Sequence, residues 1–264
     1  MQTEAAWPRA LLIGLTAGLG GGLASLGGGT LAIPLMVALL RLDAFRARGT
    51  ALALALISAL VASLVYLHGG QIDWHAVAWI ALPSALLTPW VAARTEHLRN
   101  GQLLRLFGLV LIGGALALLA RDAAGLRPWV SADLAPPYLL LVGVIEGLVT
   151  GSVGVSGGPV LAPLLVLGLG MPQQLAQGCS LASRIPAILT GLGENLRHGH
   201  VCWRCLPALA VGATLGAWAG GQLALRLPEA TLRHLFALLL MLLGLHYLWR
   251  GPRPAATETE EHRS

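Results

Sequence analysis

Two clusters of glycine, serine and proline contain the residues whose backbone N–H groups could bind a ligand. Glycine and proline disfavour continuous helix by about 1 and 3 kcal/mol relative to alanine, so each cluster should interrupt a helix. Backbone N–H groups exposed at such a break, at the positive end of a new helix, bind small anions. We therefore expect an anion site lined by Gly27, Gly28, Gly29, Thr30, Pro34, Ser156, Gly157, Gly158, Pro159 and Pro163.

Arg184 is the only charged residue between Glu146 and Glu194, and it lies in the middle of an apolar segment. An arginine at such a position costs roughly 2.5–3.5 kcal/mol on insertion, so it should face protein or an aqueous cavity. Its guanidinium fork matches an oxyanion, and the hydroxyls of Ser180 and Ser183 could add donors. We expect these three side chains to contact a substrate. An ion pair of Arg184 with either glutamate, or a position at the membrane interface, is the structural alternative.

Glu146 and Glu194 are the candidates for coupling ion movement to transport. Glu146 lies one turn after Gly143 in a long apolar segment and could carry a coupling proton, although a structural pair with Arg184 is equally open. Glu194 lies near the end of its segment, where an interfacial position is the alternative.

The elements that would position these residues occur twice. A constant spacing of 129 residues relates the glycines, prolines and tryptophans of one half to those of the other, which indicates a tandem duplication. Duplicated halves with broken apolar segments at matching places are typical of secondary transporters. The pairs are Gly14/Gly143, Gly28/Gly157, Pro34/Pro163, Gly49/Gly178, Trp74/Trp203 and Phe107/Phe236. The Gly-x-x-x-Gly ladders that open each half predict close helix packing.

Composition places the chain in a lipid bilayer. Of its 264 residues, 56% are hydrophobic and only 11% are charged, and a membrane helix needs about 20 apolar residues. We predict an all-α polytopic membrane protein with eight hydrophobic segments in two four-segment repeats, the first and fifth segments being broken at the glycine clusters. The segments are 10–40, 48–67, 75–94, 103–120, 136–168, 174–193, 204–225 and 231–249. The predicted units are a repeat at 1–121, a linker at 122–135, a repeat at 136–250 and a disordered tail at 251–264.

The basic residues are all arginine, and most lie at segment ends, which disfavours a nucleic-acid partner. If the first and fifth segments turn back at their glycines, twelve arginines share one side and four the other, as expected for a cytoplasmic face. These re-entrant segments would make the halves inverted repeats. A kinked full crossing with parallel repeats is the alternative, and it divides the arginines evenly. A homo-oligomer is left open by the sequence.

No cofactor or metal is expected. The pair Cys202 and Cys205 is interpreted as incidental, because a structural zinc site needs four ligands and only His198 and His200 are near in sequence. No phosphate-binding Gly-x-x-x-x-Gly-Lys motif occurs, so an ion gradient or the gradient of the substrate itself would supply the energy.

At these residues the chain resembles the sulfite exporter TauE/SafE family. The resemblance is carried by Gly-Gly-x-x-x-x-Pro-Leu at 28–35 and again at 157–164, and it extends over about 10–249. It implies a permease of the bacterial inner membrane for small sulfur-containing anions such as sulfite or organosulfonates, and no enzyme activity. Ser156 departs from the glycine triplet of the first half.

Two other functions are weighed against transport of an anion. A cation or metal permease would need carboxylates at the breaks, where only Glu146 is available. A rhomboid-like serine protease would use the Gly-x-Ser-Gly phrase around Ser156 with a base such as His246, but a nucleophilic serine needs that base within hydrogen-bond reach.

Overall fold

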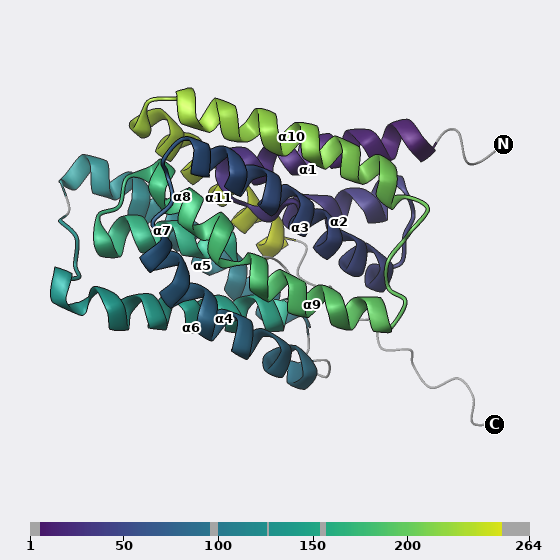
Figure 1. Cartoon of the computed structure of the whole chain (residues 1–264), viewed down its shortest axis with the longest axis horizontal. Helices are drawn as coiled ribbons and strands as arrows, with labels where there is room; N and C mark the ends of the chain where they lie inside the picture. The colour runs from purple at the N-terminus through teal and green to yellow at the C-terminus, as the bar shows by residue number, and fades with distance from the viewer. Residues whose placement is uncertain (1–5, 96–99, 126, 154–156, 250–264) are drawn as a thin grey trace.

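A computed structural model describes residues 6–95, 100–125, 127–153 and 157–249, and within these ranges the chain is helical with no strand (Figure 1). The predicted tail at 251–264 lies outside them. The helices are α1 (Ala6–Ala24), α2 (Gly27–Leu39), α3 (Ala44–His68), α4 (Trp74–Thr95), α5 (Asn100–Ala124), η1 (Ala132–Leu134), α6 (Ala135–Val153), α7 (Gly158–Leu169), α8 (Gln173–Ser183), α9 (Ile185–Arg197), α10 (Leu206–Arg226) and α11 (Glu229–Trp249).

Several of these helices match the dimensions of a bilayer. Among the described residues, four stretches are long and apolar enough to cross a membrane: Phe45–His68, Ala132–Ser152, Leu206–Arg226 and Glu229–Trp249. The helices α2 and α7 are apolar but shorter. The expected all-α architecture with several apolar membrane helices is therefore confirmed.

The first long segment is a helical hairpin. Helix α1 ends at Ala24, and the left-handed backbone of Ser25 (φ 51°) and Gly27 (φ 59°) turns the chain. A side chain placed on Gly28 would lie 3.6 Å from the carbonyl oxygen of Ala17, so α2 runs back along α1. The interruption thus lies just before the glycine triplet, whose members form the first turn of α2.

The fifth segment has the same shape. Helix α7 runs back along α6, because the Tyr138 hydroxyl donates to the carbonyl oxygen of Leu164 over 2.9 Å near the start of α6. At the other end, a side chain on Gly157 would lie 3.0 Å from Cγ of Glu146. Residues 154–156 lie outside the described part of the chain.

Helix α3 returns in the direction of α1. A side chain on Gly28 would meet Ser58, and one on Gly29 would meet Ala51, so α3 is antiparallel to α2. Since α2 is also antiparallel to α1, the chain is back on its starting side when α3 begins. In Figure 1, α4 then runs opposite to α1, and α1 lies beside α10.

The glycine ladders pack helices of the two halves against each other, which confirms the packing prediction. Side chains at Gly14, Gly18 and Gly22 would run into the backbone of α10, at positions that advance in the same direction. Side chains at Gly143, Gly147 and Gly151 would likewise run into α4. Helix α1 is therefore parallel to α10, and α6 is parallel to α4, each pair being close along its backbones.

The sixth segment, predicted as one span at 174–193, is divided into two helices. Helix α8 ends at Ser183 and α9 begins at Ile185, with Arg184 between them. Proline lacks the N–H that a continuous helix needs and clashes with the preceding turn, so Pro186 accounts for the interruption.

Candidate functional site

Arg184 joins the break in the sixth segment to the break in the first. Its side chain is fully buried, and Nη1 donates a hydrogen bond to the carbonyl oxygen of Ser25 over 2.7 Å. That carbonyl belongs to the turn between α1 and α2, where helix geometry leaves backbone acceptors without an intrahelical donor. A cation of the second half thus binds the broken backbone of the first.

Hydroxyl groups extend this contact. The Ser25 hydroxyl donates to Oγ of Ser180 over 3.1 Å, and the Ser180 hydroxyl donates to the carbonyl oxygen of Gly158 over 3.4 Å. The Tyr66 hydroxyl donates to Oε1 of Gln177 over 2.7 Å, one turn before Ser180. Each of these side chains is buried. Ser25, Gly158, Ser180 and Arg184 form what we call the central cluster.

Gly158 is sterically required in the central cluster. A Cβ atom at this position would overlap Nη1 of Arg184 and the carbonyl oxygen of Ser25. No other residue type fits without displacing one of them. The backbone of Gly158 in the second glycine cluster therefore lies directly against the Ser25 carbonyl of the first break.

Two of the backbone amides expected to face a substrate have acceptors inside the protein. The N–H of Gly28 donates to Oγ of Ser58 over 3.3 Å, and the N–H of Gly157 donates to Oγ1 of Thr150 over 3.2 Å. In this conformation both breaks are held by hydroxyls that the sequence analysis did not single out. Hydroxyl residues are too common in apolar helices for their spacing to have identified these two.

Glu146 lies beside the central cluster. Its side chain is 1% exposed, and neither carboxylate oxygen has a hydrogen-bond partner within the described ranges. Arg184 is the cation whose charge acts on it, and the buried Ser84 of α4 faces it. Glu146 packs against Gly157 and Arg184 against the adjacent Gly158, so the two charged side chains flank the same break without a direct hydrogen bond between them.

The remaining predicted residues occupy different places. The Ser183 hydroxyl bonds the carbonyl oxygen of Ser180 over 3.4 Å, within its own helix. Ser156 and the side chains of Thr30 and Glu194 lie outside the described part of the chain, as does any test of Ser156 as a nucleophile. The other members are buried along the first turns of α2 and α7 or within these helices: Gly27, Gly29, Pro34 (half-buried), Pro159 and Pro163.

Comparison with known proteins identifies the family of this chain. The sequence profile described as "Sulfite exporter TauE/SafE" matches residues 1–118 and 138–264. The chain belongs to the TauE/SafE family. This TauE/SafE protein is accordingly a membrane transporter with several apolar helices.

Curated relatives of the TauE/SafE protein agree with this assignment. It is 23% identical to "Probable membrane transporter protein YunE" of Bacillus subtilis, over 91% of this chain and 97% of the relative. It is 27% identical to a "Probable membrane transporter protein" of Xylella fastidiosa, over 91% and 92% of the two chains. The protein y4hK of Sinorhizobium fredii, another named probable membrane transporter, is 28% identical over 76% and 81%.

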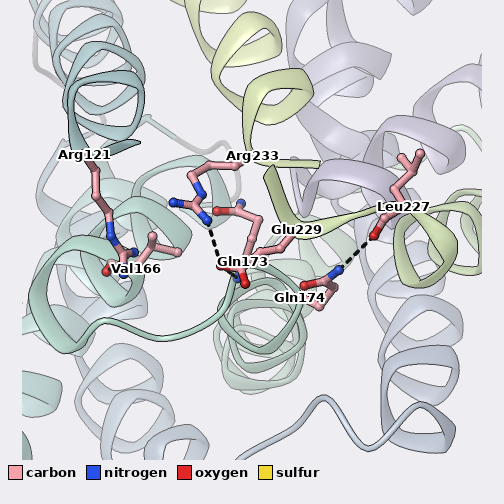
Figure 2. Close-up of polar contacts among 7 residues, drawn as sticks. All are labelled: Arg121, Val166, Gln173, Gln174, Leu227, Glu229 and Arg233. Carbon is pink, nitrogen blue, oxygen red and sulfur yellow. Dashed lines mark hydrogen bonds and ion pairs between the residues drawn. The ribbon is translucent and has the colours of Figure 1, made fainter. Parts of the chain in front are cut away.

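A second group of polar contacts in the TauE/SafE protein joins the start of α8 to α11 and the end of α5 to α7 (Figure 2). Glu229 of α11 accepts hydrogen bonds from the backbone N–H of Gln173 over 3.3 Å and from Arg233 over 2.8 Å. Gln174 donates to the carbonyl oxygen of Leu227 over 3.1 Å, and Arg121 donates to that of Val166. Glu229 thus connects the start of α8 to α11, and no sequence motif predicted this contact.

Cys202 and Cys205 of the TauE/SafE protein precede α10. Within the described ranges, no group of three or more His, Cys, Asp or Glu side chains could hold a metal ion. Cys202 donates its backbone N–H to Oγ1 of Thr50 over 2.9 Å, so the loop before α10 is anchored on α3.

Proposed function

We propose that this protein is a secondary transporter that moves a small sulfur-containing oxyanion, sulfite or an organosulfonate, across the bacterial cell membrane. The single observation that supports this most is the position of Arg184. A permanently charged guanidinium is fully buried where the breaks of both halves converge. Ionisable groups held inside membrane proteins mark substrate pathways, and arginine is the residue best matched to an oxyanion.

The residues around Arg184 suit the same ligand. Serine hydroxyls and the amides of the first turns of α2 and α7 are neutral donors, which bind an anion without adding charge. The candidate substrate site comprises Arg184, Ser180, Ser183, the glycines at 27–29 and 157–158, and Thr30 and Ser156. All described members of the central cluster are buried, so a solute would reach them only after helices move apart, as alternating access requires.

The proposed topology follows from the two hairpins. Helices α1 and α3 run in the same direction, so the first segment enters the membrane and returns to its starting side. With the same path for α6 and α7, each half crosses three times, and the eight segments form inverted repeats. The arginine-rich side is then the cytoplasmic face of the inner membrane. Helix α6 is long enough to cross on length alone, which makes its orientation the point to test.

Flux in proteoliposomes tests the function. Sulfite, sulfate, thiosulfate, taurine and sulfoacetate are offered separately to vesicles that contain the purified protein. We expect one or more of them to be transported, and Arg184→Ala to lower that flux at least about a hundredfold, since a buried charge-assisted contact is lost. Arg226→Ala, at the exposed end of α10, is the matched control and should keep the flux.

A second variant separates charge from shape. Arg184→Lys keeps the positive charge but not the planar fork, so it should retain weak transport with a raised KM. Normal flux of every anion in a folded Arg184→Ala protein would remove Arg184 from the site.

A further inference from the structure

We propose that Glu146 takes up a proton when the anion binds Arg184, so that the transporter carries one proton together with each monovalent anion. This inference rests on the proposed function, and it adds the coupling ion to it. The juxtaposition that carries it is a buried carboxylate and a buried guanidinium beside the same helix breaks.

The environment of Glu146 makes its charge depend on one partner. A carboxylate in an apolar interior is unstable unless a nearby cation or several hydrogen bonds compensate it. Neither of its oxygens has a hydrogen-bond partner among the described residues. Glu146 packs against Gly157 and Arg184 packs against the next residue, Gly158, so this buried guanidinium is the cation placed to balance the ionised carboxylate.

A bound oxyanion competes for the same guanidinium. One positive charge cannot balance two buried negative charges, and a third uncompensated charge in the interior would be strongly unfavourable. When the anion occupies Arg184, the carboxylate of Glu146 therefore binds a proton from the side on which the anion entered. When the anion is released on the opposite side of the membrane, the proton is released there too. The ionised Glu146 then balances Arg184 again. The interior charge is the same in both states.

No other carboxylate or basic side chain among the described residues of the neighbouring helices is placed to take this role. Along α4, which packs on α6, the residues between His75 and Arg94 are uncharged, and Ser84 is the polar side chain that faces Glu146. Helix α7 contains no titratable residue, and α5 contains none between Arg105 and Arg121. On α8 and α9, Arg184 is followed by no charged residue until Glu194.

The test uses a sulfonate monoanion such as methanesulfonate, whose own protonation does not change near neutral pH. Proteoliposomes containing the full chain are given a pH gradient while valinomycin and potassium hold the membrane potential at zero. With one proton per monoanion, each pH unit should sustain about tenfold accumulation on the alkaline side. Glu146→Gln, which resembles the protonated form, should abolish this accumulation yet retain exchange of labelled for unlabelled anion. Asp133→Asn, at an exposed position in η1, is the control and should behave as wild type.

The outcomes distinguish the two proposals. Anion exchange by the wild type without any response to the pH gradient overturns proton coupling and leaves the proposed function standing. Gradient-driven accumulation that survives in Glu146→Gln also overturns the role of Glu146. A wild type that exchanges neither methanesulfonate nor any anion of the panel overturns the proposed function itself. If Glu146→Gln fails to fold, an anion pulse applied to the wild type should alkalinise the outer medium, and an unchanged pH refutes the coupling.

Discussion

Helix α3 and the pair α8–α9 occupy equivalent places in the two halves, yet only the second is interrupted. Helix α3 is continuous from Ala44 to His68, and buried Ala55 stands where the second half has Arg184. Ile57 stands where the second half has Pro186. The two copies of the predicted repeat thus differ, since one has a plain apolar helix and the other has both a cation and the break that places it.

The two halves also contribute different groups to the contact between their breaks. The first half contributes a backbone acceptor, the carbonyl of Ser25, and the second contributes the donor, Arg184. The protein therefore has one central cluster shared by both halves rather than two copies of one site. Substitutions at equivalent positions should have unequal effects, and the following comparisons exploit that inequality.

The largest difference is expected between Gly158→Ala and its counterpart Gly29→Ala. A Cβ at Gly158 would overlap Arg184 and Ser25, whereas a Cβ at Gly29 would lie 3.3 Å from the carbonyl oxygen of Ala51. Overpacking lowers the free energy of unfolding by roughly 1–3 kcal/mol. We expect Gly158→Ala to lower it by about 3 kcal/mol or to prevent folding. Gly29→Ala should change stability by less than about 1 kcal/mol, because alanine also favours helix. Thermal unfolding in detergent measures both, and equal shifts would contradict the asymmetry.

A smaller effect is expected at the hydroxyls that hold the breaks. Ser58→Ala leaves the N–H of Gly28 unsatisfied, and Thr150→Val does the same for Gly157. A buried donor without an acceptor costs about 1–3 kcal/mol, so each variant should melt earlier than wild type. Ser152→Ala, whose hydroxyl bonds only its own helix, is the control. If the control lowers the melting temperature as much as the other two, the hydroxyls do not hold the breaks.

The smallest effect is expected at the starts of α4 and α10. Asp73 caps α4 by accepting from the N–H of His75 over 2.9 Å, whereas Cys202 stands at the equivalent place before α10. Burial, and then a hydrogen bond with Cys202, raise the pKa of the Cys205 thiol, so it stays protonated at neutral pH. Labelling by a maleimide should be slow near neutral pH and rise with pH. The double variant Cys202→Ser, Cys205→Ser should transport as wild type, and lost transport would assign the pair a function.

The sequence predicted the elements better than it predicted their contacts. Glycine clusters at constant spacing indicated both breaks. Each glycine lowers the stability of the helix at its own position, so this effect can be read from sequence without knowing the tertiary contacts. The break at Arg184 was missed although Pro186 signals it, since a proline inside an apolar segment also occurs in continuous helices such as α4, which contains Pro83 and Pro89.

The candidate site was predicted only as a set of residue types. Arg184 stood out because charge is rare in apolar segments, but its acceptor on Ser25 lies 159 residues away in sequence. Ser58 and Thr150 were not foreseen for the same reason, namely that only the packing of helices decides which hydroxyl faces an amide. The pairing of Arg184 with Glu146 was left as one of several alternatives.

The glycine ladders have a consequence for how such a protein arose. One ladder joins α1 to α10 and the other joins α6 to α4, so each links the first helix of one half to the third segment of the other. A single-copy ancestor would have had no third segment of a sister half in its own chain. In the proposed inverted topology it could have completed both junctions only by pairing with a second molecule of opposite orientation, and fusion of two genes would have made that pairing permanent.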